Sequence, residues 1–183
     1  GGGAVFTNAG SLSAAGNGSL TNFGSSLGTF NNTGTLTKTT GTGTTTVTTN
    51  GPVDFNNSGT LDIQSGTLSV SSTSFVQSGT VVLGSGTTLS RANGFTNTGI
   101  LRGNGTIDVS GGALTNSGTI RPDGSGADPT GVLTITGDFT QSAGGTLDMQ
   151  SEGTSAGLTD VLAISGAATL GGTLALTPVN SFL

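Results

Sequence analysis

The heptapeptide FTNTGIL at residues 95–101 has two close copies earlier in the chain, FNNTGTL at residues 30–36 and FNNSGTL at residues 55–61. All three share a Phe, an amide side chain two residues later, a Gly four residues later and an aliphatic residue six residues later. Side chains of one kind that return at fixed offsets indicate a repeat architecture, in which each copy is one structural unit.

The same pattern can be followed along most of the 183-residue chain. Its copies begin at Phe6, Phe30, Phe55, Phe75, Phe95, Leu114 and Phe139, with spacings of 24, 25, 20, 20, 19 and 25 residues. The amide position holds Asn8, Asn32, Asn57, Gln77, Asn97, Asn116 and Gln141. The glycine position holds Gly10, Gly34, Gly59, Gly79, Gly99 and Gly118, and the aliphatic position holds Leu12, Leu36, Leu61, Val81, Leu101 and Ile120. In the last copy we expect the glycine to be shifted by one residue, to Gly144.

Between these copies apolar and polar residues alternate, as in LDI at residues 61–63 and LSV at residues 68–70. This period of two predicts short, half-buried strands. Ser-Gly, Asn-Gly and Gly-Gly pairs bound the strands and adopt the positive φ of a corner at little cost. A sandwich or barrel also uses short strands but gives no reason for a repeat of about twenty residues, whereas a parallel β-solenoid does. We therefore predict an all-β, parallel β-solenoid of roughly 19–25 residues per coil, with about eight or nine coils in a rod of roughly 40 Å.

A solenoid also explains why the pattern recurs. Each coil lies on the one before it at the strand spacing, about 4.8 Å, so equivalent residues form columns along the axis. We expect Phe and Leu to form apolar columns inside the rod. We expect the amides to point inward near a corner and to bond to the amides above and below them, as stacked Asn residues do in other parallel strands. The glycines are expected to let the corner turn.

The composition excludes several classes of function. The chain has 35 Gly, eight Phe, no Trp or Tyr, no Cys and no His, which removes disulfides, thiol catalysis and the commonest metal ligand. Its net charge of −5, with four basic residues, gives no electrostatic footprint for nucleic acid or anionic lipid. No stretch of 18 apolar residues predicts a membrane span. The chain begins GGGAVF, without Met or a signal peptide, so we expect it to be a fragment of a longer protein.

Two segments depart from the regular coil. Residues 35–50 are rich in Thr and have little to bury beyond Leu36 and Val47, so we expect a strand and an elaborated corner that faces solvent. Residues 122–130, PDGSGADPT, are expected to form a loop where the regular repeat ends. We divide the rod accordingly into repeat coils at residues 1–130 and C-terminal coils at residues 131–183.

The C-terminal part resembles a known family. LTITGDFTQ at residues 133–141, DVLAI at residues 160–164 and ATLGGTL at residues 168–174 are similar to the autochaperone region, with its passenger-associated repeat, of autotransporter passenger domains and related large bacterial surface adhesins. The resemblance covers about fifty residues. It implies a secreted, right-handed parallel β-helix of Gram-negative type whose C-terminal coils fold first and template the rest. No linker helix or membrane barrel of that family follows Leu183, which leaves the export route open.

Acidic residues are the first candidates for a site, because a β-helix can be a polysaccharide lyase or hydrolase that uses clustered carboxylates, with a basic residue or Ca²⁺. The acids are Asp54, Asp62, Asp108, Asp123, Asp128, Asp138, Asp148, Glu152 and Asp160. Their spacing in the sequence places no two acids at equivalent positions of adjacent coils. We therefore interpret them as solvated charges that keep the rod soluble, and we predict no catalytic residue, no metal site and no cofactor.

Four other groups of residues are candidates for a site. Asp123 to Asp128 and Gly103 to Asp108 each resemble part of a Ca²⁺ loop but complete no motif, so weak Ca²⁺ binding stays open at the first of them. Arg102 and Arg121 hold equivalent positions and are expected to stack on an outer face, with Arg91 nearby. Ice binding requires Thr-x-Thr at the same position of successive coils, but the Thr run at residues 44–49 is expected to be confined to one region, with Ser, Asp or Gly on other coils. Asn-x-Ser/Thr glycosylation sequons occur at Asn17, Asn31, Asn56 and Asn104. We attribute them to the high content of Asn, Ser and Thr rather than to a modification.

These observations favour a non-catalytic structural or adhesive rod, extracellular or on a bacterial surface, such as an adhesin stalk, a matrix component or a fibre subunit. The ends of a solenoid expose backbone and apolar side chains, so identical copies are expected to stack end to end. Cell-surface or matrix glycans are the other expected partners. The alternatives are a β-helix polysaccharide lyase or hydrolase and a carbohydrate- or ice-binding module.

Overall fold

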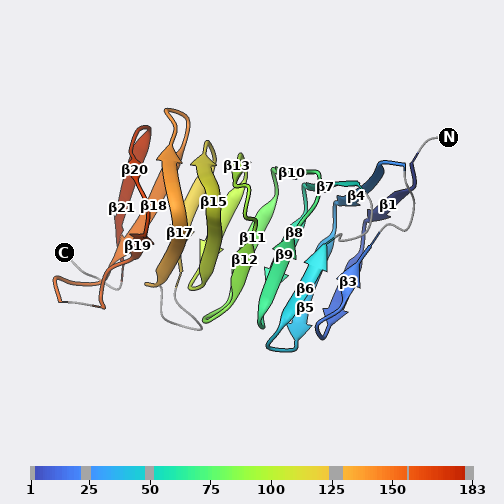
Figure 1. The fold of residues 1–183 in the computed structure, drawn as a ribbon. Coiled ribbons are helices and arrows are strands. Elements are labelled where there is room, and N and C mark those ends of the chain that lie inside the picture. The colour runs from blue at the N-terminus through green and yellow to red at the C-terminus, as the bar shows by residue number, and fades with distance from the viewer. Residues whose placement is uncertain (1–2, 22–25, 48–51, 124–129, 156, 180–183) are drawn as a thin grey trace.

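The computed structural model describes residues 3–21, 26–47, 52–123, 130–155 and 157–179, and it confirms the predicted parallel β-solenoid. About seven turns of roughly 24 residues stack along one axis, from the N-terminal end of the rod to its C-terminal end (Figure 1). The estimate of eight or nine coils exceeds these seven full turns, although the second sheet holds eight strands, and the last turn is the longest: Phe139 pairs with Ala168, 29 residues later. None of the described residues belongs to a helix, so no helical membrane span is found among them.

Each turn contributes strands to three columns, which we name face 1, face 2 and face 3 in chain order. Face 1 contains β1 (Val5–Asn8), β4 (Gly28–Asn32), β7 (Val53–Asn57), β10 (Ser74–Gln77), β13 (Phe95–Asn97), the C-terminal parts of β15 (Thr106–Asn116) and β17 (Val132–Gln141), and β20 (Ala168–Thr169). Face 2 contains β2 (Ser11–Ala15), β5 (Thr35–Thr40), β8 (Thr60–Ile63), β11 (Thr80–Leu83), β14 (Ile100–Gly103), β16 (Thr119–Pro122), β18 (Thr146–Ser151) and β21 (Thr173–Pro178). Face 3 contains β3 (Ser19–Leu20), β6 (Thr44–Val47), β9 (Thr67–Val70), β12 (Thr88–Ser90), the N-terminal parts of β15 and β17, and β19 (Val161–Ile164).

The strands form two sheets. Faces 1 and 3 belong to one 13-stranded sheet, because β15 and β17 run unbroken from face 3 of one turn into face 1 of the next. Face 2 is a separate 8-stranded sheet. The strand columns continue across residues 130 and 131, since β17 pairs with β15 and β18 pairs with β16, all in parallel.

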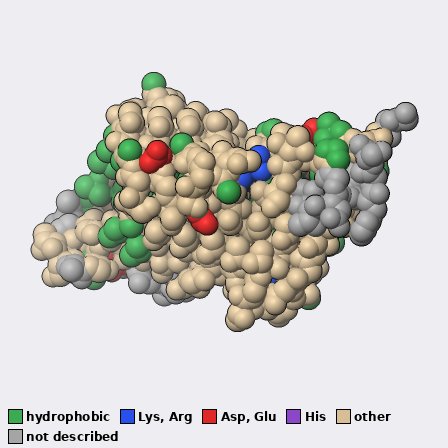
Figure 2. All heavy atoms as spheres, in the orientation of Figure 1, with side chains coloured by type: hydrophobic (Ala, Val, Ile, Leu, Met, Phe, Trp, Pro, Cys, Tyr) green, Lys and Arg blue, Asp and Glu red, His purple; other side chains and the backbone are tan. Residues whose placement is uncertain are grey.

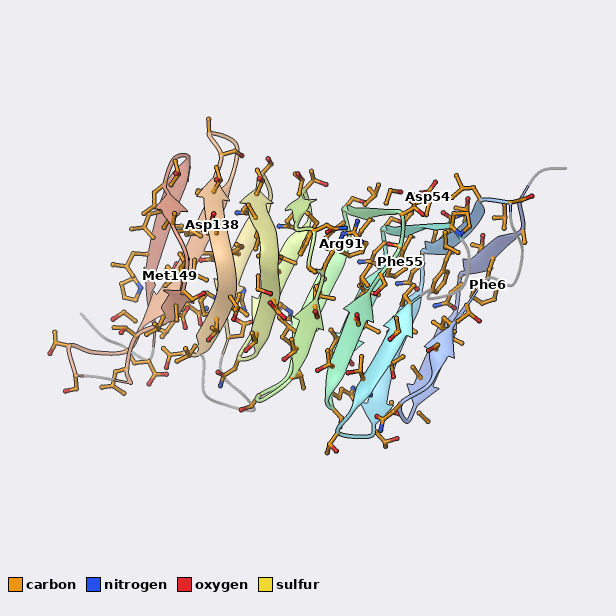
Figure 3. The ribbon with its side chains drawn as sticks, viewed as in Figure 1. Phe6, Asp54, Phe55, Arg91, Asp138 and Met149 are labelled. Atoms are coloured by element: carbon orange, nitrogen blue, oxygen red, sulfur yellow. The ribbon has the colours of Figure 1, made fainter. Side chains whose placement is uncertain are left out.

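The predicted phenylalanine column lies inside the rod on face 1 (Figure 3). Adjacent ring centroids along the column are 5.1, 4.8, 5.3 and 5.2 Å apart, for Phe6, Phe30, Phe55, Phe75 and Phe95. Leu114 and Phe139 extend the column in the next two turns, as the repeat predicts. Such ring pairs add about 0.5–1.5 kcal/mol each beyond the burial of their surface.

The amide column is also confirmed, and it runs as two hydrogen-bonded segments. In the first, each amide nitrogen donates to the amide oxygen of the next turn, at 2.7 Å for each step from Asn8 through Asn32 and Asn57 to Gln77. The second connects Asn97, Asn116 and Gln141 at 2.7 and 2.8 Å. Between the segments Gln77 donates to the Gly79 carbonyl of its own corner at 2.9 Å, a contact that Asn97 and Asn116 also make with Gly99 and Gly118.

The glycine column has a different cause from the one predicted. None of these glycines has a positive φ. Instead, a Cβ at Gly34, Gly59, Gly79, Gly99 or Gly118 would lie 2.0–2.1 Å from the carbonyl oxygen of the glycine one turn earlier. The close approach of consecutive turns, rather than the turn conformation, therefore requires glycine here. Positive φ occurs at the following corner, for example at Gly41 and Gly66.

The last copy of the repeat is shifted by two residues rather than one. Thr119 pairs with Thr146 and Ile120 with Leu147, so Gly145, and not Gly144, follows Gly118 in the column. The two extra residues widen the first corner of that turn, where the Gly145 amide donates to the Ser142 carbonyl.

The Thr-rich segment at residues 35–50 buries more than predicted. It forms β5 and β6, and Lys38 and Thr45 are as buried as the core, with 1% and 3% of their surfaces exposed. The Lys38 ammonium donates to the carbonyls of Gly16, Thr40 and Gly41 at 2.9, 3.2 and 3.1 Å. This cation therefore closes the corner between faces 2 and 3 from the inside, because it donates hydrogen bonds to three carbonyls of that corner.

The buried amide column should contribute more to stability than the outer amides. We expect Asn57→Ala to lower the free energy of unfolding by about 1–3 kcal/mol, because it leaves buried groups of Asn32 and Gln77 without a partner. The control is Asn56→Ala, which removes only the half-buried bond to Asn31. Urea unfolding followed by circular dichroism measures both. Equal losses of unfolding free energy in the two variants would contradict a special contribution of the amide column.

The glycine column should be intolerant of a methyl group except at its first member. We expect Gly79→Ala to cost about 1–3 kcal/mol, because the new Cβ would overlap the Gly59 carbonyl. The matched control is Gly10→Ala in the first turn, where nothing lies within 4 Å of the new Cβ. Thermal unfolding midpoints of the two variants check this, and a similar drop in both would rule out the steric explanation.

Candidate functional site

The acidic side chains of the described part are dispersed except near Arg121, where Asp123, Asp148 and Asp160 all interact electrostatically with its guanidinium. On the register, Asp54 lies beside Thr29 and Ser74, Asp62 beside Thr37 and Val82, and Asp108 beside Ser90 and Thr136. No group of three acids that could hold a metal is found among the described residues. Asp128 and the rest of the expected Ca²⁺ loop at residues 124–129 lie outside them.

Several acids bond to neighbouring turns rather than serving only as solvated charges. Asp54 accepts a hydrogen bond from the Ser74 hydroxyl at 2.6 Å, and Asp138 accepts one from the Ala167 amide at 2.8 Å (Figure 3). Asp160 is buried and accepts from the amides of Gly131 and Gln150 at 2.8 and 2.7 Å. Burial raises the pKa of Asp160, against the two amides, which lower it. The interpretation of all acids as solvated charges is thus wrong for Asp160, which joins the loop before β17 to β18.

The four basic residues fall into two pairs. Arg102 and Arg121 lie side by side on adjacent turns of face 2, as predicted, and their side chains are 44% and 37% exposed. Arg91 does not lie with them. It is 8% exposed and donates inward to the carbonyls of Val70, Ser72 and Gly94 at 3.2, 3.0 and 3.1 Å.

Arg91 therefore closes a corner between faces 3 and 1, as Lys38 closes one between faces 2 and 3. Its guanidinium carbon lies 5.8 Å from the centre of the Phe75 ring, which adds a cation–π contact. Burial lowers the pKa of Arg91. The sequence offers no signal that separates these buried cations from the exposed Arg102, which also stands beside a glycine of positive φ, Gly103.

A hollow of about 420 Å³ lies on the outside of face 2. This face 2 hollow is lined by Thr60, Thr80, Val82, Ile100, Arg102, Thr119, Arg121 and Asp148. Asp123 holds both arginines, with 2.5 Å between its Oδ1 and Arg121 Nε and 3.4 Å between its Oδ2 and an η nitrogen of Arg102. The hydrogen bond with Asp123 raises the pKa of Arg121.

The outer surface is otherwise rich in hydroxyl groups. Single threonines recur beyond the run at residues 44–49, of which Thr48 and Thr49 lie outside the described residues: one outward position of face 3 holds Thr44, Thr67, Thr88, Thr106 and Thr134. A second column on face 2 holds Thr35, Thr60, Thr80, Thr119, Thr146 and Thr173, with Ile100 between the third and fourth. The next outward position on face 3 varies among Thr, Ser and Asp, so the paired T-x-T array that ice binding requires is not repeated on each turn. Figure 2 shows one side of the rod, on which apolar and charged side chains form only small, scattered patches along the described flank.

The sequon asparagines bond between turns. Asn56 donates to Asn31 at 2.9 Å, and the side-chain oxygens of Asn17 and Asn104 accept from the amides of Gly43 and Val132 at 3.1 and 3.2 Å. These residues therefore hold adjacent turns together on the outside of the rod.

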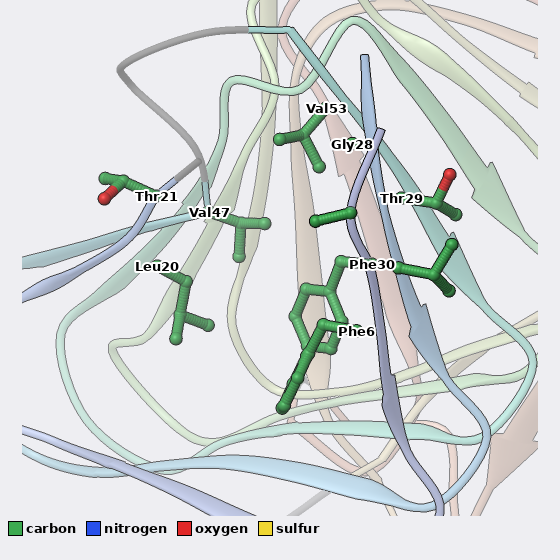
Figure 4. A pocket seen from close by; sticks show the side chains of 10 residues that line it. Phe6, Leu20, Thr21, Gly28, Thr29, Phe30, Val47 and Val53 are labelled. Carbon is green, nitrogen blue, oxygen red and sulfur yellow. The ribbon is translucent and has the colours of Figure 1, made fainter. Parts of the chain in front are cut away.

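Both end faces of the rod are apolar. At the N-terminal end, Phe6 is 52% exposed, and a hollow of about 330 Å³ opens onto Phe30, Leu20, Val47 and Val53 (Figure 4). At the C-terminal end, Leu170, Leu174 and Leu176 are 68%, 68% and 66% exposed. These side chains occupy inward positions of the repeat and are covered on one side only, by the neighbouring turn.

No protein-family model, curated protein or solved structure matches this chain. Its geometry alone identifies it as a β-solenoid repeat protein.

Proposed function

We propose that this chain is a non-catalytic structural and adhesive rod outside the cell or on a bacterial surface, whose units join end to end. The observation that carries the proposal is the continuous parallel stack of turns, in which like residues lie over like and seal an apolar interior along the length of the rod. Buried apolar residues inside the rod are at most 8% exposed, whereas the leucines of the last turn are about two-thirds exposed.

The dispersed acids also favour a non-catalytic role. Glycoside hydrolysis uses two carboxyl groups about 5–10 Å apart on either side of the bond. In the described part, Asp54, Asp138 and Asp160 are each engaged by donors of a neighbouring turn. Their hydrogen bonds serve the stacking of the turns.

The two end faces are complementary in strand order. The first turn exposes β1, β2 and β3 on faces 1, 2 and 3, and β20, β21 and β19 occupy the same faces at the other end. A second copy stacked head to tail would therefore extend all three strand columns in parallel, with Leu174 over Leu12 and Leu176 over Ala14. A heterologous contact of this type propagates into a filament.

The amide column does not contribute to such a junction. Leu170 follows Gln141 in the column, so a stacked copy would place Asn8 against a leucine. The Nε2 of Gln141 is buried without a partner for the same reason. The apolar columns and the strand edges supply the contact energy.

The assignment to a cell surface rests on the C-terminal resemblance to the autochaperone region of autotransporter passengers. Residues 131–183 include β17 to β21, which continue the columns of the earlier turns. A pre-formed set of turns offers a strand edge on which the next turn can pair. This supports the proposal that the C-terminal turns template folding.

End-to-end assembly is tested by negative-stain electron microscopy and sedimentation velocity over a range of concentrations. We expect filaments whose length grows with concentration, and we expect Leu174→Asp to abolish them, because the junction would bury a charge. The matched control is Val76→Asp on the flank of the rod, where Val76 is 51% exposed. Compact monodisperse particles at all concentrations, or an equal effect of the control, would contradict the proposal.

A further inference from the structure

One junction between turns, near the middle of the rod, is paired less completely than the others (Figure 1). On face 1, β10 and β13 share a single residue pair, Gln77 with Asn97. By contrast, β4 and β7 share five pairs, and β7 and β10 share four. Every other strand pairing in the described part has at least two pairs. We call the junction between β10 and β13 the seam.

A backbone hydrogen bond between turns is also replaced at the seam. In four other turns, the amide of the column glycine donates to a carbonyl of the turn before, at 2.9, 2.9, 3.0 and 3.1 Å for Gly34, Gly59, Gly79 and Gly118. The Gly99 amide donates instead to Oδ1 of Asn97 in its own turn, at 3.2 Å. The bonds on either side of it remain, at 2.9 Å from Thr98 to the Gln77 carbonyl and from Ile100 to the Gly79 carbonyl.

The two inner columns of face 1 change at the same junction. The side-chain amide of Gln77 donates to its own corner and not to Asn97, so the two segments of the amide column meet here. The rings of Phe75 and Phe95 are inclined by 60° to each other. In the turns before, the angles from Phe30 to Phe55 and from Phe55 to Phe75 are 19° and 21°. Neither the amide ladder nor the parallel ring stack therefore runs through the seam.

Arg91 bridges the seam at the corner between faces 3 and 1 (Figure 3). Its guanidinium donates to the carbonyls of Val70 and Ser72, in the corner that leads into β10, at 3.2 and 3.0 Å. It also donates to the carbonyl of Gly94, directly before β13, at 3.1 Å. The planar fork of donors lets one side chain bond to both corners at once. Arg91 thus supplies hydrogen bonds between two turns whose face 1 strands are poorly paired.

Faces 2 and 3 are well paired across the same junction. On face 2, β11 and β14 share four residue pairs, and on face 3, β12 and β15 share three. Any separation at the seam is therefore one-sided, because face 1 can open while the other two faces stay joined.

We infer that the seam is a bending point of the rod, at which β13 separates from β10 while faces 2 and 3 act as the hinge, and that Arg91 is the clamp that holds it closed. The inference goes beyond the proposed function, because it concerns the motion of one chain and requires neither a cell surface nor a second copy. Proteins open locally where their cooperative units are least stable. A stack with equally paired junctions has no preferred place to bend, whereas this rod has one near its middle.

Amide hydrogen exchange of the full chain, followed residue by residue by NMR, tests the seam. We expect the amides of Thr98 and Gly99 to have protection factors at least tenfold lower than the amides at the same positions of the adjacent turns, which are Ser78, Gly79, Ser117 and Gly118. The amides of β14 should stay protected, because face 2 remains paired. Equal protection at the three corners would overturn the inference. Equal loss in β14 would overturn the one-sided hinge.

The variant Arg91→Met removes the clamp and keeps an unbranched side chain. We expect protection at Thr98 and Gly99 to fall at least a further tenfold, with β14 unchanged within about threefold. The matched control is Lys38→Met, which removes the other buried corner cation and should leave Thr98 and Gly99 within about twofold. A uniform fall over all turns would show general destabilisation and overturn the clamp. If Arg91→Met does not fold, Arg91→Lys, which keeps the charge without the fork, should lower protection at the seam at least threefold.

The variant Gln77→Asn tests the seam in the opposite direction. It introduces the residue whose amide donates to the next turn elsewhere in the column, so we expect protection at Thr98 and Gly99 to rise at least threefold. The matched control is Gln141→Asn, because the next residue in its column is Leu170, which offers no amide side chain. The control should leave protection at the seam within about twofold. No gain in Gln77→Asn, or an equal gain in the control, would overturn the link between the interrupted column and the seam.

Discussion

Everything in this structure depends on the parallel hydrogen bonding of each turn to the turn before it, in a register that places like residues over like. The register brings the Phe rings to centroid distances near 5 Å and the amide groups of Asn8, Asn32 and Asn57 to 2.7 Å. It also places the carbonyl oxygen of each glycine in the glycine column where a Cβ on the glycine of the next turn would lie. A sequence that keeps this register must repeat the same kinds of side chain at the same positions.

The corners are the weak points of such a stack, because a tight corner turns carbonyls away from the strand ladder. Two buried cations, in an otherwise nearly uncharged interior, donate hydrogen bonds to these corner carbonyls. Lys38 satisfies three carbonyls at one corner, and Arg91 satisfies three carbonyls at another while lying over Phe75. Since half of the basic residues are used in this way, the positive charge left for the outer surface is confined to Arg102 and Arg121.

The interior, the end faces and the flanks of the rod present different kinds of side chain. The interior holds the turns together, the end faces offer apolar side chains and strand edges to another unit, and the flanks display columns of hydroxyl groups. On face 2 these columns meet the two arginines in a hollow that follows the rod axis.

The sequence by itself determined the solenoid, its columns and the stacking of Arg102 on Arg121, because a strand has a period of two and a parallel stack repeats whatever one turn contains. It could not determine the number of turns or the shift at Gly145, since inserted residues at a corner leave no mark on the alternating pattern. Only the tertiary structure decided that Arg91 and Lys38 lie inside, that Asp160 is buried and that Thr forms columns on two faces. The reason is that a residue next to a corner can turn either way, and the choice depends on which carbonyls the neighbouring turn leaves within reach.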